Sequence, residues 1–228
     1  MPDSKHAVDR FKGRLTLAMA QHVELMSGVR NNRRQASLET MLVEQFMMST
    51  IVLWEAFVND LILQYVTEEP KVFLKSLDGR IRNSVKDKFG PAASNRIWMS
   101  HPKSLSRASA QALIDPRGSN VTTSSAQALA TRANDNLAAS YARKFSLVSE
   151  DRNFIDFVFA LRNYLGHRSN RARTSLKEAA ANLDGTGVDG PLAKKITTVG
   201  AYLRQRIGGD TRAITIAKRF VAIAESLK

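Results

Sequence analysis

Apolar residues recur at helical spacing along most of the chain. Between residues 5 and 29 they follow the period of an amphipathic helix, with Lys and Arg between them. A longer helix is predicted from Leu38 to Glu68, and from Phe46 to Leu63 apolar residues occupy nearly every face of it. A helix that is apolar all round is typically buried. We therefore expect this helix to lie at the centre of the fold.

The remaining pattern predicts shorter helices. Residues 92–136 are dominated by Ser, Ala and Thr, so we expect mostly loops there, with a turn at Asp115-Pro116-Arg117-Gly118 and a short helix from about Ser125 to Ala139. No convincing series of strands is present, which makes the predicted fold class all-α. The other helices are expected at 71–89, 150–166, 171–183, 192–207 and 211–227.

Composition limits the protein class. The chain has 228 residues, of which 43% are apolar, and we expect a single helical domain over 1–228. It has no Cys, which excludes disulfides, thiolate metal sites and a Cys nucleophile. The first residues are charged where a secretory signal needs an apolar stretch, so we expect a cytoplasmic protein. Glu55, Asn59 and Asp60 interrupt the most apolar helix, which favours a buried core helix over a membrane span.

The formal net charge is +13, and the basic residues are spread along the chain. Such an excess raises the local concentration of polyanions. Nucleic acid is the commonest partner of this kind, and an anionic membrane surface is the second. A protein that is merely basic is the third interpretation of the charge.

Several catalytic motifs are missing from the sequence. The Gly-rich segments lack the lysine and strand context of a phosphate-binding loop, and there is no Ser nucleophile elbow. The four His residues are scattered, so we expect no metal and no cofactor. What remains is an arginine followed five positions later by a histidine, and this spacing occurs twice. Arg96 and His101 lead straight into Pro102 in the weakly patterned region, which favours a surface turn.

The second occurrence, Arg162-Asn163-Tyr164-Leu165-Gly166-His167, ends the apolar helix predicted at 150–166. It resembles the R-(polar)-x-x-x-H signature of the HEPN superfamily. These are small α-helical proteins, and many are metal-independent ribonucleases of toxin–antitoxin, anti-phage or RNA-processing systems. Residues 53–60 resemble the long early HEPN helix that carries an acidic residue facing the active site, for which Glu55 is the candidate.

The resemblance covers residues 38–170 and is similar in layout to the RiboL-PSP type. It implies a HEPN-like helical bundle extended by C-terminal helices at 171–228. Because positions five apart on a strict helix differ by about 140°, Arg162 and His167 converge only if the helix loosens near Gly166 or if two chains share the site. The family's usual arrangement is a homodimer that pairs two such motifs across a cleft.

These residue types suit RNA cleavage by the ribose 2′-hydroxyl, which gives a 2′,3′-cyclic phosphate. His167 is expected to transfer the proton, and Arg162 to hold the phosphate and stabilise the transition state. Asn163 is expected to orient the phosphate or the histidine, and Glu55 to tether Arg162 or to set the tautomer of the histidine. The residues expected to line an RNA-binding rim are Arg168, Arg171 and Arg173.

Each of these interpretations has an alternative. Arg162 and His167 are also suited to capping a helix end, Glu55 to a structural ion pair, and the arginines after the motif to a solvated helix face. The first hypothesis is thus an endoribonuclease, acting as a toxin or defence effector with an antitoxin or other regulatory partner. The second is a non-catalytic HEPN module that binds nucleotide, RNA or a partner protein. The third is an unrelated basic helical protein that binds DNA or membrane.

Overall fold

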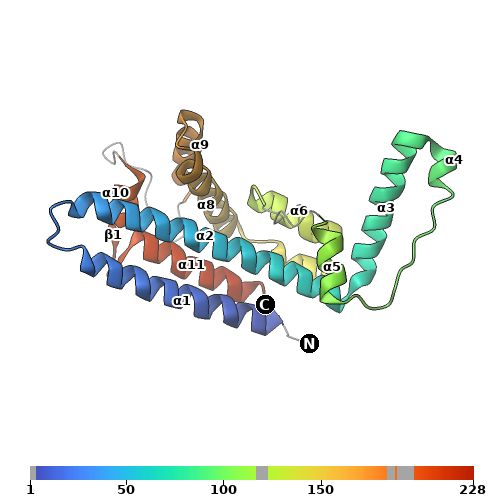
Figure 1. Cartoon of the computed structure of the whole chain (residues 1–228), viewed down its shortest axis with the longest axis horizontal. Helices are drawn as coiled ribbons and strands as arrows, with labels where there is room; N and C mark the ends of the chain where they lie inside the picture. The colour runs from blue at the N-terminus through green and yellow to red at the C-terminus, as the bar shows by residue number, and fades with distance from the viewer. Residues whose placement is uncertain (1–3, 117–122, 184–187, 189–197) are drawn as a thin grey trace. The chain divides into compact units, whose positions relative to one another are not determined.

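A computed structural model of the chain describes residues 4–116, 123–183, 188 and 198–228. Helices dominate these residues (Figure 1). The long helices are α1 (Ser4–Gly28), α2 (Gln35–Glu68), α3 (Pro70–Phe89), α8 (Ser149–His167), α9 (Asn170–Ala181) and α11 (Arg212–Ser226). The shorter helices are α4 (Pro91–Ser94), α5 (Arg107–Ile114), α6 (Ala126–Asn136), α7 (Ala139–Ala142), the 3-10 turn η1 (Arg143–Phe145) and α10 (Val199–Arg204).

The all-α class predicted from the sequence is confirmed. Among the described residues the only strands are β1 (Arg206–Ile207) and β2 (Asp210–Thr211), which pair antiparallel. This hairpin was not predicted, and the helix expected at 211–227 begins one residue later, at Arg212. The residues that could have predicted the hairpin are Gly208 and Gly209. Gly208 adopts a φ of 62°, a conformation that favours glycine in a tight turn. Residues 192–197 of the helix expected at 192–207 lie outside the described part of the chain.

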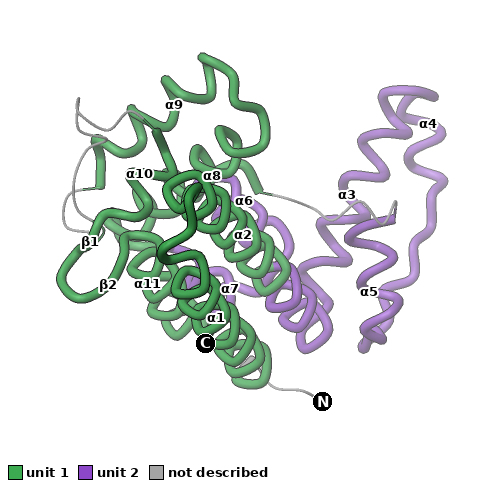
Figure 2. The backbone as a smooth tube through the Cα atoms, turned by 60° about the vertical axis from the view of Figure 1, so that its left-hand side comes forward, with its two compact units in different colours: residues 1–58, 123–126, 147–228 green, residues 59–122, 127–146 purple. Residues whose placement is uncertain are grey.

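The chain divides into two compact units (Figure 2). Unit 1 contains residues 1–58, 123–126 and 147–228, and unit 2 contains residues 59–122 and 127–146. The boundary between Val58 and Asn59 falls inside the continuous helix α2. The single domain over 1–228 stays a prediction.

Aromatic side chains form the centre of unit 1. Phe11 of α1 lies with its ring centroid 4.7 Å from that of Phe57 and 5.9 Å from that of Trp54, both on α2. Phe220 of α11 continues the cluster at 4.9 Å from Trp54 and 5.1 Å from Phe154 of α8. Trp54 is only 1% exposed. The first part of α2 is therefore the central core helix that the sequence predicted.

Helix α2 is the only helix of the described residues that is long and apolar enough to cross a membrane. Of its most apolar window, 61% is already buried within the structure. Burial of this extent is typical of the core helix of a soluble protein, which agrees with the prediction made from Glu55, Asn59 and Asp60.

Unit 2 has its own smaller core. Tyr65, near the end of α2, stacks on Tyr141 of α7 at 4.2 Å and meets Phe145 edge-on at 6.3 Å. Helix α5 falls in the region expected to be mostly loop and was missed by the sequence prediction. The residue that could have predicted the start of α5 is Ser106. Its hydroxyl caps the helix by accepting a hydrogen bond from the Ser109 N–H.

Candidate functional site

Helix α8 positions the R-N-x-x-x-H motif at its C-terminal end. Glu150 and Asp151 lie in its first turn, where carboxylates interact favourably with the helix dipole. The helix stops at Arg168, which adopts the left-handed conformation with a φ of 53° and donates its N–H to the Tyr164 carbonyl at 2.8 Å. The predicted apolar face is buried, and its residues are Phe154, Phe157, Val158, Leu161 and Leu165. Burial of this face fixes the orientation of the motif.

The motif is helical throughout. Helix α8 extends to His167, so the first of the two alternatives, a helix that loosens near Gly166, is not what the structure shows. The reason is that Gly166 continues the helix and the backbone reverses only at Arg168. Helix geometry therefore separates Arg162 and His167 by about 140° within one chain. Within one chain the motif therefore does not bring Arg162 and His167 to the same face of the helix.

Arg162 and Glu55 are brought together. The Nε atom of Arg162 lies 3.4 Å from Oε1 of Glu55 on α2. The Glu55 side chain is 10% exposed and that of Arg162 is 32% exposed. Oε1 has no hydrogen-bond partner among the described residues, so the contact is an ion pair without a well-aligned hydrogen bond. This geometry agrees with a Glu55 that tethers Arg162, and it equally fits a structural ion pair.

Two opposing effects act on the Glu55 carboxyl. Burial raises its pKa above the ordinary value, because the charged form loses hydration, and the positive charge of Arg162 acts in the opposite direction. The burial effect is the larger of the two, so the net result is a raised pKa. A buried carboxyl with a raised pKa beside an arginine is a feature that functional sites share with structural ion pairs.

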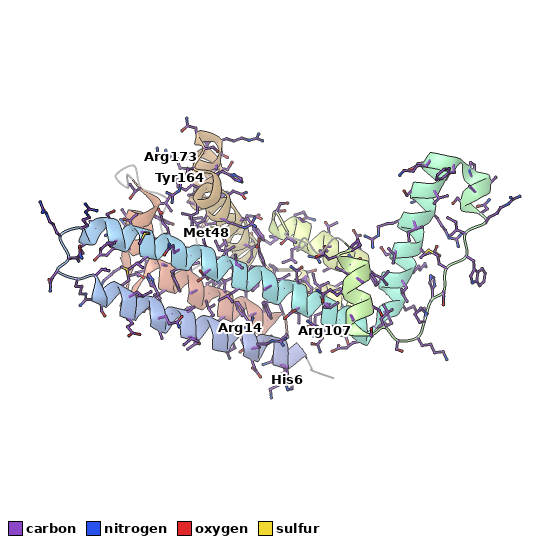
Figure 3. The ribbon with its side chains drawn as sticks, in the orientation of Figure 1. His6, Arg14, Met48, Arg107, Tyr164 and Arg173 are labelled. Carbon is purple, nitrogen blue, oxygen red and sulfur yellow. The ribbon has the colours of Figure 1, made fainter. Side chains whose placement is uncertain are left out.

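Asn163 and His167 lie on a different side of the helix. Both are exposed, and their four-residue spacing places them as neighbours on the same face of α8. Arg171 and Arg173 are also exposed, in the first turns of α9. Figure 3 labels Tyr164 and Arg173 where α8 passes into α9. These side chains are accessible to a ligand, and their exposure also fits a solvated helix face.

Arg168 is engaged by a residue that the sequence analysis missed. Its guanidinium donates two hydrogen bonds to Glu44 of α2, at 3.3 and 2.5 Å, and lies 5.7 Å from the Tyr164 ring centroid. A guanidinium held at both nitrogens by a carboxylate is less available to phosphate than a free one. The sequence signal for Glu44 was its position about three turns before Glu55 on the same face of α2.

A groove of about 760 Å³ lies beside the last turn of α8. Leu165 and Arg168 border it on one side, and the first half of α2 forms the other side. Its α2 residues are Ser37, Thr40, Met41, Glu44, Gln45, Met48 and Ser49. Met48 is labelled in Figure 3. The groove's hydroxyl, amide and thioether groups can contact a ribose or a base, and its one carboxylate, that of Glu44, is paired with Arg168.

The part of the chain described by the structure contains no group of three or more His, Cys, Asp or Glu residues that could hold a metal ion. The motif and its α2 neighbour supply an arginine, a histidine, an amide and a largely buried carboxylate. Comparisons of the chain with protein families, with curated proteins and with solved structures found no match.

Proposed function

We propose that the chain is a metal-independent endoribonuclease that acts as a homodimer, with the motif from Arg162 to His167 as its active site. The observation that carries the proposal is the contact between Arg162 and Glu55. It is made through Nε of Arg162. No bond from either Nη group to another described residue is present, so the fork of the guanidinium can bind two phosphate oxygens.

In this proposal the 2′-hydroxyl of the substrate loses its proton to a His167 imidazole and attacks the adjacent phosphorus. The bond between phosphorus and the 5′-oxygen breaks, and that oxygen takes up a proton. The products are a 2′,3′-cyclic phosphate and a 5′-hydroxyl. Arg162 stabilises the negative charge that develops on the phosphoryl oxygens, and Asn163 orients the phosphate or the imidazole. The need for a 2′-hydroxyl restricts the substrate to RNA.

The geometry of α8 supports the proposed dimer. In one regular helix Arg162 and His167 face directions about 140° apart, so one phosphate is not reached by both. A two-fold axis near this helix would bring Arg162 of one protomer towards the partner's histidine, since the same patch is presented by both chains. The partner chain then completes a site that each chain lacks by itself.

The proposal includes a biological setting that follows the resemblance. In this setting the protein is a cytoplasmic toxin or host-defence effector, and an antitoxin or another regulatory protein restrains it. The net charge of +13 supports RNA as substrate, because cations increase the rate of encounter with a polyanion.

The second candidate is a non-catalytic module that binds nucleotide, RNA or a partner protein. The observation that favours it is the separation of Arg162 from His167 on the helix, which leaves a single chain without a complete site. It predicts saturable binding without cleavage of any RNA. The third candidate, a basic helical protein that binds DNA or membrane, predicts salt-sensitive binding to duplex DNA. It also predicts that the Arg162 and His167 side chains point away from one another and from any dimer cleft, and their separation on α8 agrees with the first part of that prediction.

The decisive experiment compares two histidine variants. His167→Ala should abolish RNA cleavage in the presence of a chelator, while its circular dichroism spectrum remains that of the native protein. The matched control is His6→Ala, because His6 is also exposed and lies on α1, away from the motif in the sequence. This control should cleave normally. Undiminished cleavage by His167→Ala would refute the assignment.

Sharing of the site between chains has its own test. Arg162→Ala and His167→Ala are each expected to be inactive. Refolded together in equal amounts, they should recover about a quarter of the native activity, because half of the dimers are mixed and each mixed dimer retains one intact site. No recovery is expected if the two residues act within one chain.

A further inference from the structure

Much of the excess positive charge is concentrated in one part of unit 2. Residues 70–107 contain nine Lys or Arg and two Asp or Glu, a net charge of +7 out of the total of +13. They form α3, α4, the irregular segment that follows α4 and the first residue of α5, Arg107, which pairs with Asp60. Most of α3 lies at the surface, and its buried residues, Pro70, Phe73 and Leu74, are confined to its first turns. This part of the chain therefore presents a basic surface that is independent of the Arg162–His167 motif.

The irregular segment is held against α3. Arg82 donates hydrogen bonds to the carbonyls of Ser94 at 3.3 Å and Ile97 at 2.8 Å, and the Ser94 hydroxyl donates to the Arg82 carbonyl at 3.0 Å. One turn earlier on α3, Asp78 accepts a hydrogen bond from Arg82 at 2.7 Å and lies 3.7 Å from Nε2 of His101. The segment thus runs back along α3, and its course can be followed in Figure 1.

Burial alternates along this segment. Ile97 and Met99 are partly covered, whereas Arg96, Trp98 and Ser100 are exposed. Alternation of this kind is typical of an extended chain lying on a surface, because successive side chains point to opposite sides. The segment consequently holds the Trp98 ring outward, beside the exposed Arg96.

Trp98 is 91% exposed, and Phe89, at the end of α3, is 72% exposed. A large aromatic ring left in water gives up the free energy of burial that other Trp residues gain. The chain's other tryptophan, Trp54, is 1% exposed. Surfaces that bind single-stranded nucleic acid combine two features: aromatic rings that stack on the bases, and Lys and Arg side chains that attract the phosphates.

We propose that α3 and the segment 95–103 form a binding surface for single-stranded RNA, in which Trp98 stacks on a base and Arg96 and Lys103 contact the backbone. The choice of RNA over DNA rests on the proposed function, whereas the charge and the exposed ring do not. The surface captures substrate and takes no part in the chemical step. The proposal assigns a role to the segment from Arg96 to His101. This segment has the same arginine-to-histidine spacing as the Arg162–His167 motif but does not lie at the end of an apolar helix.

Nucleic acid fits this surface better than a membrane does. Membrane-binding segments bury a continuous apolar face in the interface. Here Lys88 is next to Phe89 in the sequence. The direct neighbours of Trp98, Ile97 and Met99, are partly covered, so the exposed residues on either side of its ring are Arg96 and Ser100. Isolated rings interleaved with cations match a strand in which bases alternate with phosphates.

The test uses the full-length chain and an oligomer of about twelve 2′-O-methyl uridines, a length within the range of single-strand sites. This probe has no free 2′-hydroxyl and is not cleaved by the proposed reaction. Its binding, measured by fluorescence anisotropy, should weaken about 5- to 150-fold in Trp98→Ala, the effect of losing one stacked base. Trp98→Phe should bind nearly as well as the native protein, because the ring is retained.

Intrinsic fluorescence supplies a second readout. The probe should quench the emission of Trp98 in the native protein and leave the emission of Trp98→Phe unchanged, because the remaining Trp54 is buried. The matched control for the loss of an exposed apolar side chain is Val148→Ala, since Val148 is 60% exposed and lies in unit 1. This control should bind as the native protein does.

The contribution of charge is tested by Arg96→Gln with Lys103→Gln. The slope of log K against log salt should decrease by about 0.7 for each phosphate that the variant no longer neutralises. The control, Arg33→Gln with Arg34→Gln, removes the same charge from an exposed turn and should leave the slope nearly unchanged.

Three results would overturn the proposal: normal binding by Trp98→Ala, equal binding of duplex RNA, or a shift of the Trp98 emission by phosphatidylserine vesicles without quenching by the probe. The outcomes separate this proposal from the proposed ribonuclease. Weakened binding by Trp98→Ala in a protein that cuts no RNA supports the surface and refutes the enzyme. Normal binding by Trp98→Ala together with loss of cleavage in His167→Ala supports the enzyme and refutes the binding surface.

Discussion

The carboxylate of Glu55 and the guanidinium of Arg162 meet at 3.4 Å, with the carboxylate almost buried and its Oε1 atom without a hydrogen-bond partner among the described residues. The free energy lost when a carboxylate is removed from water exceeds the free energy gained from a poorly aligned ion pair. The pair is therefore a weak contributor to stability. Its effect is to hold Nε of Arg162 and so to direct the guanidinium, which is what the proposed active site needs.

We expect Glu55→Gln to separate stability from activity. The change removes a poorly solvated charge, and Arg162 is sufficiently exposed to be hydrated alone, so the free energy of unfolding should change by less than about 1 kcal/mol. The rate of RNA cleavage should fall by about 100-fold, because the guanidinium loses the group that positions it. Urea denaturation and single-turnover cleavage measure the two effects. A large loss of stability with full activity would indicate a purely structural pair.

The effect of Glu55→Gln on the free energy of unfolding should depend on pH. The pKa of Glu55 is raised in the folded protein, so the folded state binds more protons than the unfolded state between the ordinary pKa of 4.5 and the raised one. The contribution of Glu55 to stability therefore decreases as pH rises through that window. Relative to the native protein, Glu55→Gln should gain stability from pH 4.5 upward and reach a plateau above the raised pKa. Urea denaturation at a series of pH values measures this difference, and a constant difference would contradict the assignment.

The three arginines expected to form an RNA-binding rim should not be equivalent. Arg168 is held by Glu44 through two hydrogen bonds, whereas Arg171 and Arg173 are exposed on α9. We expect Arg171→Gln with Arg173→Gln to weaken RNA binding and to reduce the salt slope by about 0.7 for each phosphate that is no longer neutralised. Arg168→Gln should change binding little and lower the free energy of unfolding by about 1–3 kcal/mol, because the Glu44 carboxylate, 14% exposed, loses its charged partner. Anisotropy titrations at several salt concentrations distinguish the two, and equal effects would show that Arg168 leaves Glu44 to bind RNA.

The sequence was sufficient for the parts of the fold that depend on local periodicity. The helices at residues 5–29 and 171–183 lie within two residues of those observed, because apolar spacing and the breaks at either end are local signals. Helix α5 and the hairpin at Gly208 were missed, since both are short and each depends on one or two capping or turn residues. The pairing of Glu55 with Arg162 was expected only through the family resemblance. The bond between Glu44 and Arg168 was missed because it depends on how α2 and α8 pack.

His22 should make the protein sensitive to acid. Its side chain is 5% exposed and stacks on Phe46 at 4.3 Å, and burial lowers its pKa below 6.5. The unfolded state therefore binds more protons, so stability present above pH 6.5 is lost as pH falls through the lowered pKa. His22→Phe should reduce this loss between pH 7 and pH 5 in thermal denaturation. The control is His6→Gln on the same helix, where His6 is exposed. An acid response unchanged in His22→Phe would assign it to other groups.

Two glycines should respond to alanine in opposite directions. A Cβ at Gly200 of α10 would lie 2.4 Å from Cγ2 of Thr40 on α2, whereas a Cβ at Gly13 in α1 meets no atom within 4 Å. Gly200→Ala should thus destabilise the protein by about 1–3 kcal/mol, because the packed helices must separate. Gly13→Ala should stabilise it by about 0.5–1 kcal/mol through helix propensity. Thr40→Ser removes the clashing methyl group and should restore part of the stability of Gly200→Ala, which thermal denaturation of the double variant measures. If the double variant is no more stable than Gly200→Ala alone, the contact between α10 and α2 is not the cause.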